Sequence, residues 1–418
     1  MKLVKSALLS ALLLITAAVS GQMFAASADE YDQEFDVSAG GTLTLDSDAG
    51  PIEVNTWDQN RVRIRIRNAE DFEVELRQSG ADVIVRAESD RRGLFGFGRS
   101  NIRFDVNVPE SYNVDLDTGG GSIVVGPLNG DVIADTSGGR IEVGRVTGRV
   151  EVDTSGGGIE IDDVEGDVIA ETSGGSIAIG DVIGDVSADT SGGRINIGNV
   201  TGDVYADTSG GNIVIGNVGG DMEADTSGGN ITVGEGAGSV VLDTSGGTIR
   251  ADWAIGRIIA DTSGGNIYLA GSDTAVEADT SGGNIEIDAS NGPVQADTSG
   301  GSITIKAAVG PIRADTAGGR IDAELAAYSG QRDASVELES SGGDVTIRLP
   351  AGHSANIVAD LEVSRRARRD YRIYTDFPLT INEDEDGNIV GRGDINGGGD
   401  RIFLETTNSD IHIVSTGN

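Results

Sequence analysis

Apolar side chains return along most of the chain with a period of 18 residues. When Asp135 is counted as position 1 of a unit, position 7 is Ile in twelve consecutive units, from Ile123 to Ile321. Position 9 is mostly Val or Ile, position 16 is Val, Ile or Met, and position 18 is mostly Ala. Polar residues alternate with these, as in strands that have one buried face. The pattern predicts two short strands per unit, Ile-x-Ile and Val-x-Ala.

Position 12 supplies a third apolar contact, which we expect to point inward from the connecting turn. A short period without slips is typical of a solenoid, in which each coil buries its apolar side chains against the next coil. The sequence therefore predicts an all-β, single-stranded β-solenoid (β-helix) with 18-residue coils, two short strands per coil and a cap at both ends. No helix of more than a turn or two is expected. Position 12 is valine in five coils in a row, at Val146, Val164, Val182, Val200 and Val218.

The repeat also predicts the domain organisation. Residues 1–28 are expected to be a signal peptide, and residues 29–116 an N-terminal β-rich cap with the first solenoid strands. Residues 117–327 form the regular array of twelve repeats, and residues 328–418 the irregular C-terminal coils and cap. Caps are needed because an open terminal coil exposes unpaired backbone groups and apolar side chains.

Position 1 begins the turn sequence Asp-Thr-Ser-Gly-Gly. Stacked coils place these carboxylates about 4.8 Å apart, where each adjacent pair repels by roughly 1 kcal/mol even in water. We expect each Asp to accept the N–H groups two and three residues on, and the glycines to adopt positive φ at the corners. The alternative is a ladder of Ca²⁺ sites, since Ca²⁺ binds several oxygens.

Composition limits the partners. The chain of 418 residues has a net charge of -38, 64 glycines, 4% aromatic residues and no cysteine. Such acidity argues against nucleic acid or an anionic membrane as a partner. Without cysteine, disulfides, thiol catalysis and thiolate metal sites are excluded, and we expect no cofactor and no metal.

The N-terminus resembles a secretory signal. Lys2 and Lys5 precede an apolar run from Ala7 to Val19, and a small-x-small cleavage sequence ends at Ala28. We expect cleavage between Ala28 and Asp29, and no transmembrane segment after the signal is removed. The expected location is outside the cytoplasm, whether periplasmic, on the cell surface or secreted.

Three stretches resemble the bacterial putative adhesin family, exported β-solenoid proteins whose domain has no assigned function. They are an opening segment, the serial Ser-Gly-Gly-x-Ile units and a closing segment. The resemblance covers essentially the whole mature chain, and it implies the fold and export but no catalytic residues. This sequence departs from the family in its long run of nearly invariant 18-residue units. The opening segment is Asp48–Val54 with Trp57-Asp58, and the closing segment contains Phe377–Thr380, Ile395–Gly399 and Thr407–Ile411.

Enzymatic function is disfavoured. The two histidines, His353 and His412, both lie near the C-terminus, so no histidine-based nucleophile or metal site is expected. Paired carboxylates can hydrolyse glycosides, but a dozen equivalent aspartates have no distinguishing environment. The chain is therefore not expected to be an enzyme.

Outward positions of the strands are the candidate partner-binding face. Apolar residues at positions 8 and 17 could form an exposed stripe on which a partner or a second copy binds, although β-branched residues are also simply good strand formers. The basic cluster Arg365–Arg369 is expected to pair with acidic residues of the chain or to remain solvated. The candidate residues are Ile133, Ile169, Tyr205, Val214, Val241, Ile259 and Tyr268.

These features together favour a non-enzymatic exported β-solenoid that acts as an adhesin-like or scaffold protein of the bacterial cell envelope. The alternative is a binding module for an extracellular glycan or another envelope component. The expected partner is accordingly an envelope protein, a glycan or a second copy of the chain.

Overall fold

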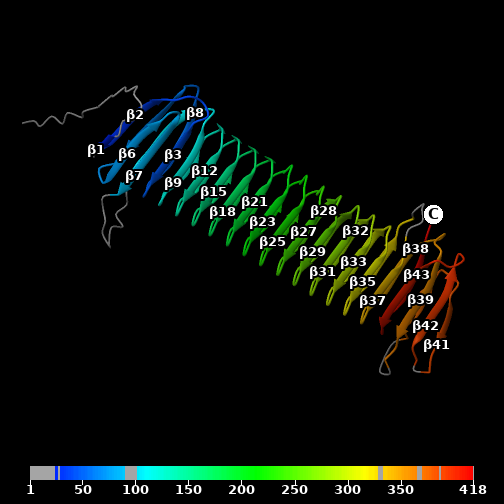
Figure 1. The fold of residues 1–418 in the computed structure, drawn as a ribbon. Helices are drawn as coiled ribbons and strands as arrows, with labels where there is room; N and C mark the ends of the chain where they lie inside the picture. Colours follow the sequence, from blue (N-terminus) through cyan, green and yellow to red (C-terminus); the bar gives the residue numbers. More distant parts are fainter. Residues whose placement is uncertain are drawn as a thin grey trace, which may run out of the picture. The chain divides into compact units, whose positions relative to one another are not determined.

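The structure, a computed structural model, describes residues 24–26, 29–89, 101–327, 333–364, 370–385 and 387–417. It has two compact units, Met1–Thr172 and Ser173–Asn418. Every element in the described residues is a β-strand, and within each unit successive strands of a sheet lie side by side (Figure 1). The prediction of an all-β solenoid is confirmed.

The first unit has two long sheets, A and B, and a short third side. Regular coils contribute one strand to each sheet, in parallel register. Across sheet A the strands are β1 (Phe24–Ala26), β6 (Phe72–Ser79), β7 (Asp82–Ser89), β3 (Thr42–Ser47), β9 (Asn113–Thr118), β12 (Val132–Thr136), β15 (Val150–Thr154) and β18 (Val168–Thr172). Across sheet B they are β2 (Glu30–Asp36), β5 (Arg61–Arg67), β8 (Arg103–Pro109), β4 (Ile52–Trp57), β10 (Ile123–Val125), β13 (Ile141–Val143) and β16 (Ile159–Ile161). The third side consists of β11 (Leu128–Asn129), β14 (Val146–Thr147) and β17 (Val164–Glu165).

The second unit continues the same coil pattern. Sheet A contains β21 (Val186–Thr190), β23 (Val204–Thr208), β25 (Met222–Thr226), β27 (Val240–Thr244), β29 (Ile258–Thr262), β31 (Val276–Thr280), β33 (Val294–Thr298), β35 (Ile312–Thr316), β37 (Val336–Ser340), β43 (Asp400–Thr407), β39 (Ala355–Glu362), β42 (Ile389–Ile395) and β41 (Thr380–Glu383). Sheet B contains β19 (Ile177–Ile179), β22 (Ile195–Ile197), β24 (Ile213–Ile215), β26 (Ile231–Val233), β28 (Ile249–Ala254), β30 (Ile267–Ser272), β32 (Ile285–Ser290), β34 (Ile303–Ala308), β36 (Ile321–Leu325), β38 (Val345–Pro350), β44 (Ile411–Thr416) and β40 (Ile373–Thr375). The two-residue strand β20 (Val182–Ile183) lies on the third side.

The core is the column of inward positions that the sequence predicts. Ile213 pairs with Ile231 in sheet B and Val204 pairs with Met222 in sheet A, and all four side chains are buried. Equivalent residues of neighbouring coils therefore stack directly on one another. Each coil buries apolar surface only against its neighbours, so its stability depends on theirs.

The third side differs from the prediction of two strands per coil. Position 12 points inward as expected, but in the first coils it lies in a short strand of its own, as in β14 and β20. From the coil of β28 onward, one continuous strand of five or six residues runs from position 7 toward position 12. In these coils position 10 is no longer glycine, as at Asp252. Loss of the glycine is not sufficient, however, because Asp162 occupies the same position and β16 still ends at Ile161.

Both chain ends of the array are closed by antiparallel strands. In the first unit β6 and β7 form a hairpin against sheet A, and β2 and β5 lie at the edge of sheet B. In the second unit β39 pairs with β43 on one side and with β42 on the other, and β41 follows β42. Their edges carry charged residues such as Asp32 and Glu383, which discourage further strand pairing.

Candidate functional site

The Asp-Thr-Ser-Gly-Gly turn that recurs in most repeats is closed by its threonine. Thr244 is fully buried, and its Oγ1 donates a 2.9 Å hydrogen bond to the carbonyl of Gly229 in the preceding coil. The same oxygen accepts the N–H of Gly247 at 3.2 Å. Equivalent bonds recur in other coils of both units. The expectation that aspartate closes this turn is therefore wrong, because the acceptor lies one residue later.

The second glycine of each turn is required by a close approach between coils. A Cβ atom on Gly265 would lie 1.7 Å from the carbonyl oxygen of Gly247. On the first glycine, Gly264, the nearest heavy atom would be 3.7 Å away, which is ordinary contact. Positive φ is expected at the corner glycines, which are this pair and the glycine at position 14; in the regular coils it is not found at the pair, but it occurs at position 14 in four coils. The glycines concerned are Gly130, Gly148, Gly166 and Gly184.

Side-chain oxygens close the corners that precede the strands. In the second unit Asp185 Oδ1 accepts the N–H of Asp203 at 2.8 Å, and Asp203 Oδ1 accepts the N–H of Asp221 at 2.8 Å. Asparagines do the same before sheet B, where Asn212 Oδ1 accepts the N–H of Asn230 at 2.8 Å. These short acidic and amide side chains replace the backbone partner that a corner N–H lacks. Their repetition is thus structural.

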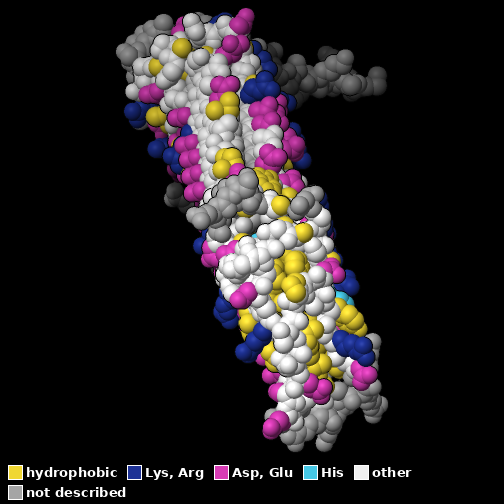
Figure 2. All heavy atoms as spheres, turned by 90° about the vertical axis from the view of Figure 1, so that its right-hand side faces the viewer, with side chains coloured by type: hydrophobic (Ala, Val, Ile, Leu, Met, Phe, Trp, Pro, Cys, Tyr) yellow, Lys and Arg dark blue, Asp and Glu magenta, His cyan; other side chains and the backbone are white. Residues whose placement is uncertain are grey.

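The position-1 aspartates form a different row on the outer face of sheet A. Asp225 pairs in register with Asp243, and Asp243 with Asp261. Burial, followed by the like charges of Asp225 and Asp261, raises the pKa of Asp243. The pKa values of Asp207 and Asp279 are raised by the same causes in the same order. Acidic side chains accordingly gather in rows on the surface (Figure 2).

Neither the aspartate row nor the histidines form a metal site in the described part of the chain. No group of three or more His, Asp or Glu side chains there is arranged to hold a metal ion. His353 Nε2 is buried without a hydrogen bond, 3.6 Å from Asp400 Oδ2, and burial lowers its pKa while Asp400 opposes the shift. His412 stacks on Tyr374, with ring centroids 4.9 Å apart.

A shallow groove of about 320 Å³ crosses the outer face of sheet A from the coil of β29 to β43. Its base is apolar because position 15, an aspartate in five earlier coils, is Ala275, Pro293 and Pro311 in three successive coils. Each of these residues directly precedes a strand, where proline's missing N–H is tolerated. We name this surface the sheet A groove.

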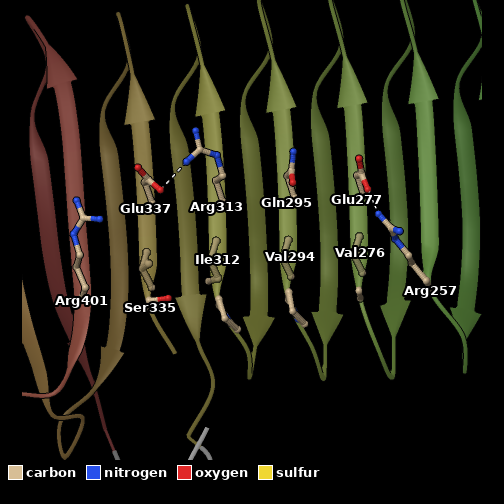
Figure 3. A pocket seen from close by; sticks show the side chains of 14 residues that line it. Arg257, Val276, Glu277, Val294, Gln295, Ile312, Arg313, Ser335, Glu337 and Arg401 are labelled. Atoms are coloured by element: carbon tan, nitrogen blue, oxygen red, sulfur yellow. Dashed lines mark hydrogen bonds and ion pairs between the residues drawn. The ribbon is translucent and has the colours of Figure 1, made fainter. Parts of the chain in front are cut away.

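Charged side chains alternate along the sheet A groove (Figure 3). Arg313 Nη1 lies 2.6 Å from Glu337 Oε2, and Arg257 forms an ion pair with Glu277. Arg401 forms no ion pair with another described residue, and its guanidinium carbon lies 5.2 Å from the centre of the Phe403 ring. The lining has three arginines and two glutamates, a net charge of +1, in a chain whose net charge is -38.

The seven residues predicted as a partner-binding face lie on two different sheets. Tyr205, Val241 and Ile259 are on the outer face of sheet A in the second unit, and Tyr205 and Val241 line one shallow groove there. Val214 and Tyr268 lie on sheet B, where Arg250 stacks 4.8 Å from the Tyr268 ring centre. The remaining two, Ile133 and Ile169, lie on sheet A of the first unit.

Exposure further separates these residues. Ile133, Tyr205 and Val214 are 43–46% exposed, whereas the other four are half-buried. The sequence argument missed Ile183 and Ile255, which are 61% and 57% exposed. Both occupy position 13, which is polar or small in the coils between them, so an alignment of the repeats would have singled them out.

Two predictions fall outside the described residues. The cleavage site at Ala28 and the basic cluster Arg365–Arg369 are not described, although Asp29 begins the second described segment. Strand β1 lies upstream of the predicted cleavage site and pairs with β6. In the described part of the chain, no helix has the length and apolar character needed to span a bilayer.

No protein-family model and no curated protein matches this chain. Solved structures that are similar to this chain include two described as adhesion proteins and one described as a lipid binding protein. Their TM-scores are all below 0.3. The structures are a putative adhesin from Bacteroides fragilis (13% identity, 60% of this chain and 97% of the other, TM-score 0.27), a putative cell adhesion protein from Clostridium sporogenes (8%, 93% and 100%, 0.15) and a putative lipid binding protein from Parabacteroides distasonis (17%, 60% and 97%, 0.27).

Proposed function

We propose that this chain is a non-enzymatic, exported β-solenoid that acts as an adhesin-like or scaffold protein of the bacterial cell envelope. Its partner would bind along the sheet A groove. The observation that carries the proposal is the row of alternating charges between Arg257 and Arg401 on a flat parallel sheet. Such a row offers repeated contacts, at about 4.8 Å spacing, to an extended partner of mixed charge.

Two features support binding in place of catalysis. Four of the five charged groups of the sheet A groove form arginine–glutamate pairs, and its lining has no histidine, cysteine or lysine that could activate or act as a nucleophile. Its open, shallow form also differs from the enclosed, water-excluding sites in which charges stabilise a transition state. Export is supported by the two lysines at the N-terminus, the apolar run that follows them and the small-x-small sequence that ends at Ala28.

A second candidate function is favoured by a separate observation. The third side of the second unit has an exposed apolar groove next to a tryptophan, which suits a glycan better than a charged partner. In that case the chain would be a glycan-binding module of the envelope.

The test exchanges one ion pair of the sheet A groove. Arg313 lies directly opposite Glu337 in the register of β35 and β37. The double variant Arg313→Glu/Glu337→Arg therefore preserves the pair and the fold while it inverts the charge order. Binding of the purified protein to cells of the encoding organism should fall several-fold, because charge order determines register with a partner.

The matched control is an exchange elsewhere on the surface. Lys306 forms an ion pair with Asp288 at 2.7 Å on sheet B, outside the sheet A groove. The variant Lys306→Asp/Asp288→Lys should bind cells as the native chain does. Equal binding by both double variants would place the partner elsewhere, and turnover of any substrate by the native chain would overturn the non-enzymatic assignment.

A further inference from the structure

A second groove, of about 510 Å³, lies on the third side of the coils in the second unit. Position 13 is Thr201, Gly219 and Ala237 in three successive coils, so its floor is made of small residues. The strongly exposed Ile183 and Ile255 stand at the two ends of this column. Small side chains between two large ones form a depression into which a flat ring could reach the backbone. We name this surface the tryptophan groove.

Trp253 forms part of the wall of the tryptophan groove. Its ring also lies against Gly271 of the next coil, where a Cβ atom would come within 2.8 Å of the indole. That contact holds the ring in place. The indole is half-exposed, and its N–H donates to no other residue in the described parts of the chain. A tryptophan with one apolar face and an available donor is suited to an amphipathic ligand.

The polar rim of the tryptophan groove is almost uncharged. Asn199 and Asn217 lie on it, and Glu235 is the single charged group in the lining. The Oδ1 atoms of the two asparagines accept backbone N–H groups at 3.1 and 2.9 Å. Because Asn217 Oδ1 faces the Glu235 N–H, the Nδ2 donors of Asn217 point away from that hydrogen bond. A groove lining with a single charged side chain, in a chain of net charge -38, favours a neutral ligand.

The backbone of the tryptophan groove is already used in hydrogen bonds between coils. The N–H of Gly219 donates to the carbonyl of Val200 at 2.8 Å, and the N–H of Ala237 donates to the carbonyl of Val218 at 2.9 Å. A peptide could therefore not add as a strand, since that mode needs free main-chain groups. A ligand must be recognised by the side-chain amides, the indole and the small floor.

We infer that the tryptophan groove binds a neutral glycan chain, with one sugar ring against Trp253 and Ile255. Apolar ring faces of the sugar would contact the indole and the small floor, and its hydroxyls would bond to the Asn217 amide and the Thr201 hydroxyl. The inference deepens the second candidate function and rests on the proposed envelope location for its biological meaning. The binding chemistry itself does not depend on that location.

The chain provides its own reporter for the test. Trp57 and Trp253 are its two tryptophans, so Trp57→Phe leaves Trp253 as the single indole. This variant is titrated with neutral hexasaccharides: cellohexaose, laminarihexaose, maltohexaose and chitohexaose. We expect at least one to shift the Trp253 emission to shorter wavelength with a saturable dependence on concentration. Calorimetry on the native chain repeats the titration, because Trp57 Nε1 donates to the Arg61 carbonyl at 2.7 Å and its loss could disturb the fold.

Variants connect binding to the tryptophan groove. Trp253→Ala should weaken the affinity about tenfold or more, the loss expected for one aromatic contact. Tyr374→Ala removes an exposed aromatic residue outside this groove and should leave the affinity unchanged. The anionic oligogalacturonate should bind more weakly than the neutral sugars. Equal, salt-sensitive binding of oligogalacturonate would overturn the inference.

Three further results would overturn it. The first is the absence of binding by every neutral hexasaccharide at millimolar concentration. The second is a shift of the Trp253 emission when the protein alone is concentrated, which would show that a second copy fills the groove. The third is an emission shift caused by apolar peptides or lipid vesicles and by none of the sugars. Binding of the Arg313/Glu337 exchange variant to cells is a separate measurement. Failure of glycan binding would therefore leave the proposed adhesin function intact, and failure of the cell-binding test would leave the glycan inference intact.

Discussion

The Thr-Ser-Gly-Gly turns and the outer face of sheet A in the second unit are equally repetitive, but for different reasons. In the turns, invariance follows from contact: Thr244 is bonded to two glycines, and Gly265 has no room for a side chain. On the outer face, Asp243 is just as regular and its side chain is exposed, yet partial burial and then the like charges of its neighbours raise its pKa. The turns stabilise the stack, whereas the aspartate row opposes it.

An aspartate row that lowers stability requires another role. The outer face of sheet A also carries Tyr205, Val241 and Ile259, so without charge it would be a flat, apolar sheet surface. Such surfaces associate with one another. A carboxylate on every strand prevents this, at the expense of repulsion along the row. Repetition therefore has two sources, packing in the turns and solubility on the face.

The largest expected effect separates the two glycines of one turn. Gly265→Ala would force the Gly247 carbonyl to move, so we expect a loss of about 3 kcal/mol or more in the free energy of unfolding. Gly264→Ala, the matched control, should change it by less than about 1 kcal/mol. Urea unfolding followed by circular dichroism measures both. Equal effects would show that the turn can shift to accommodate a Cβ atom at Gly265, and would contradict the explanation from packing.

The next effect concerns the buried threonine. Thr244→Val keeps the shape but removes a donor and an acceptor, and leaves the Gly247 N–H and Gly229 carbonyl without that partner. We expect a loss of about 1–3 kcal/mol. The adjacent Ser245→Ala, on an exposed side chain, should be nearly neutral. A neutral Thr244→Val variant would mean that other groups or water replace the hydroxyl.

Much of the fold could be predicted from the sequence, because a period of 18 determines which residues stack. The inward positions, such as Ile213 and Val204, are buried as predicted. The third strand was missed because Val146 and Val200 look alike in sequence, whereas β14 is a strand and Val200 forms only isolated bridges. Strand identity there depends on pairing between coils.

The candidate sites were less accessible to sequence reasoning. An outward position was recognisable, but the sheet to which it belongs was not used, so Val214 and Tyr205 were grouped although they lie on different sheets. Grooves depend on side-chain size in several neighbouring coils at once. Arg257 and Glu277, 20 residues apart, meet only because one arginine reaches across to the next coil.

The outer face should respond to charge removal with the opposite sign from the turns. A raised pKa in the folded state means that the penalty of the row grows as pH rises above about 3.9, the ordinary value, and is complete above the raised pKa. The triple variant Asp207→Asn/Asp243→Asn/Asp279→Asn should therefore gain about 0.2–1 kcal/mol per site at neutral pH. The gain should shrink as pH falls toward 4.

Unfolding at several pH values measures this difference between the variant and the native chain, so that carboxylates elsewhere cancel. Asp252→Asn, an exposed residue outside the row, is the control. The triple variant should also aggregate at lower protein concentration, as light scattering would show. A gain independent of pH, or a loss, would contradict the proposed repulsion.

The smallest expected effect comes from ions. If the row is a set of repelling charges, CaCl₂, MgCl₂ and NaCl at equal ionic strength should raise the stability alike, by a few tenths of a kcal/mol, because screening does not depend on ion identity. A true Ca²⁺ ladder would behave otherwise, since Ca²⁺ at a hundred times its dissociation constant would stabilise the fold by about 2.7 kcal/mol. A selective Ca²⁺ effect that disappears in the triple Asp→Asn variant would turn the aspartate row from a solubility device into a binding site. Equal effects of the three salts would leave the turns as the stabilising rows and the face as the one that keeps solenoids apart.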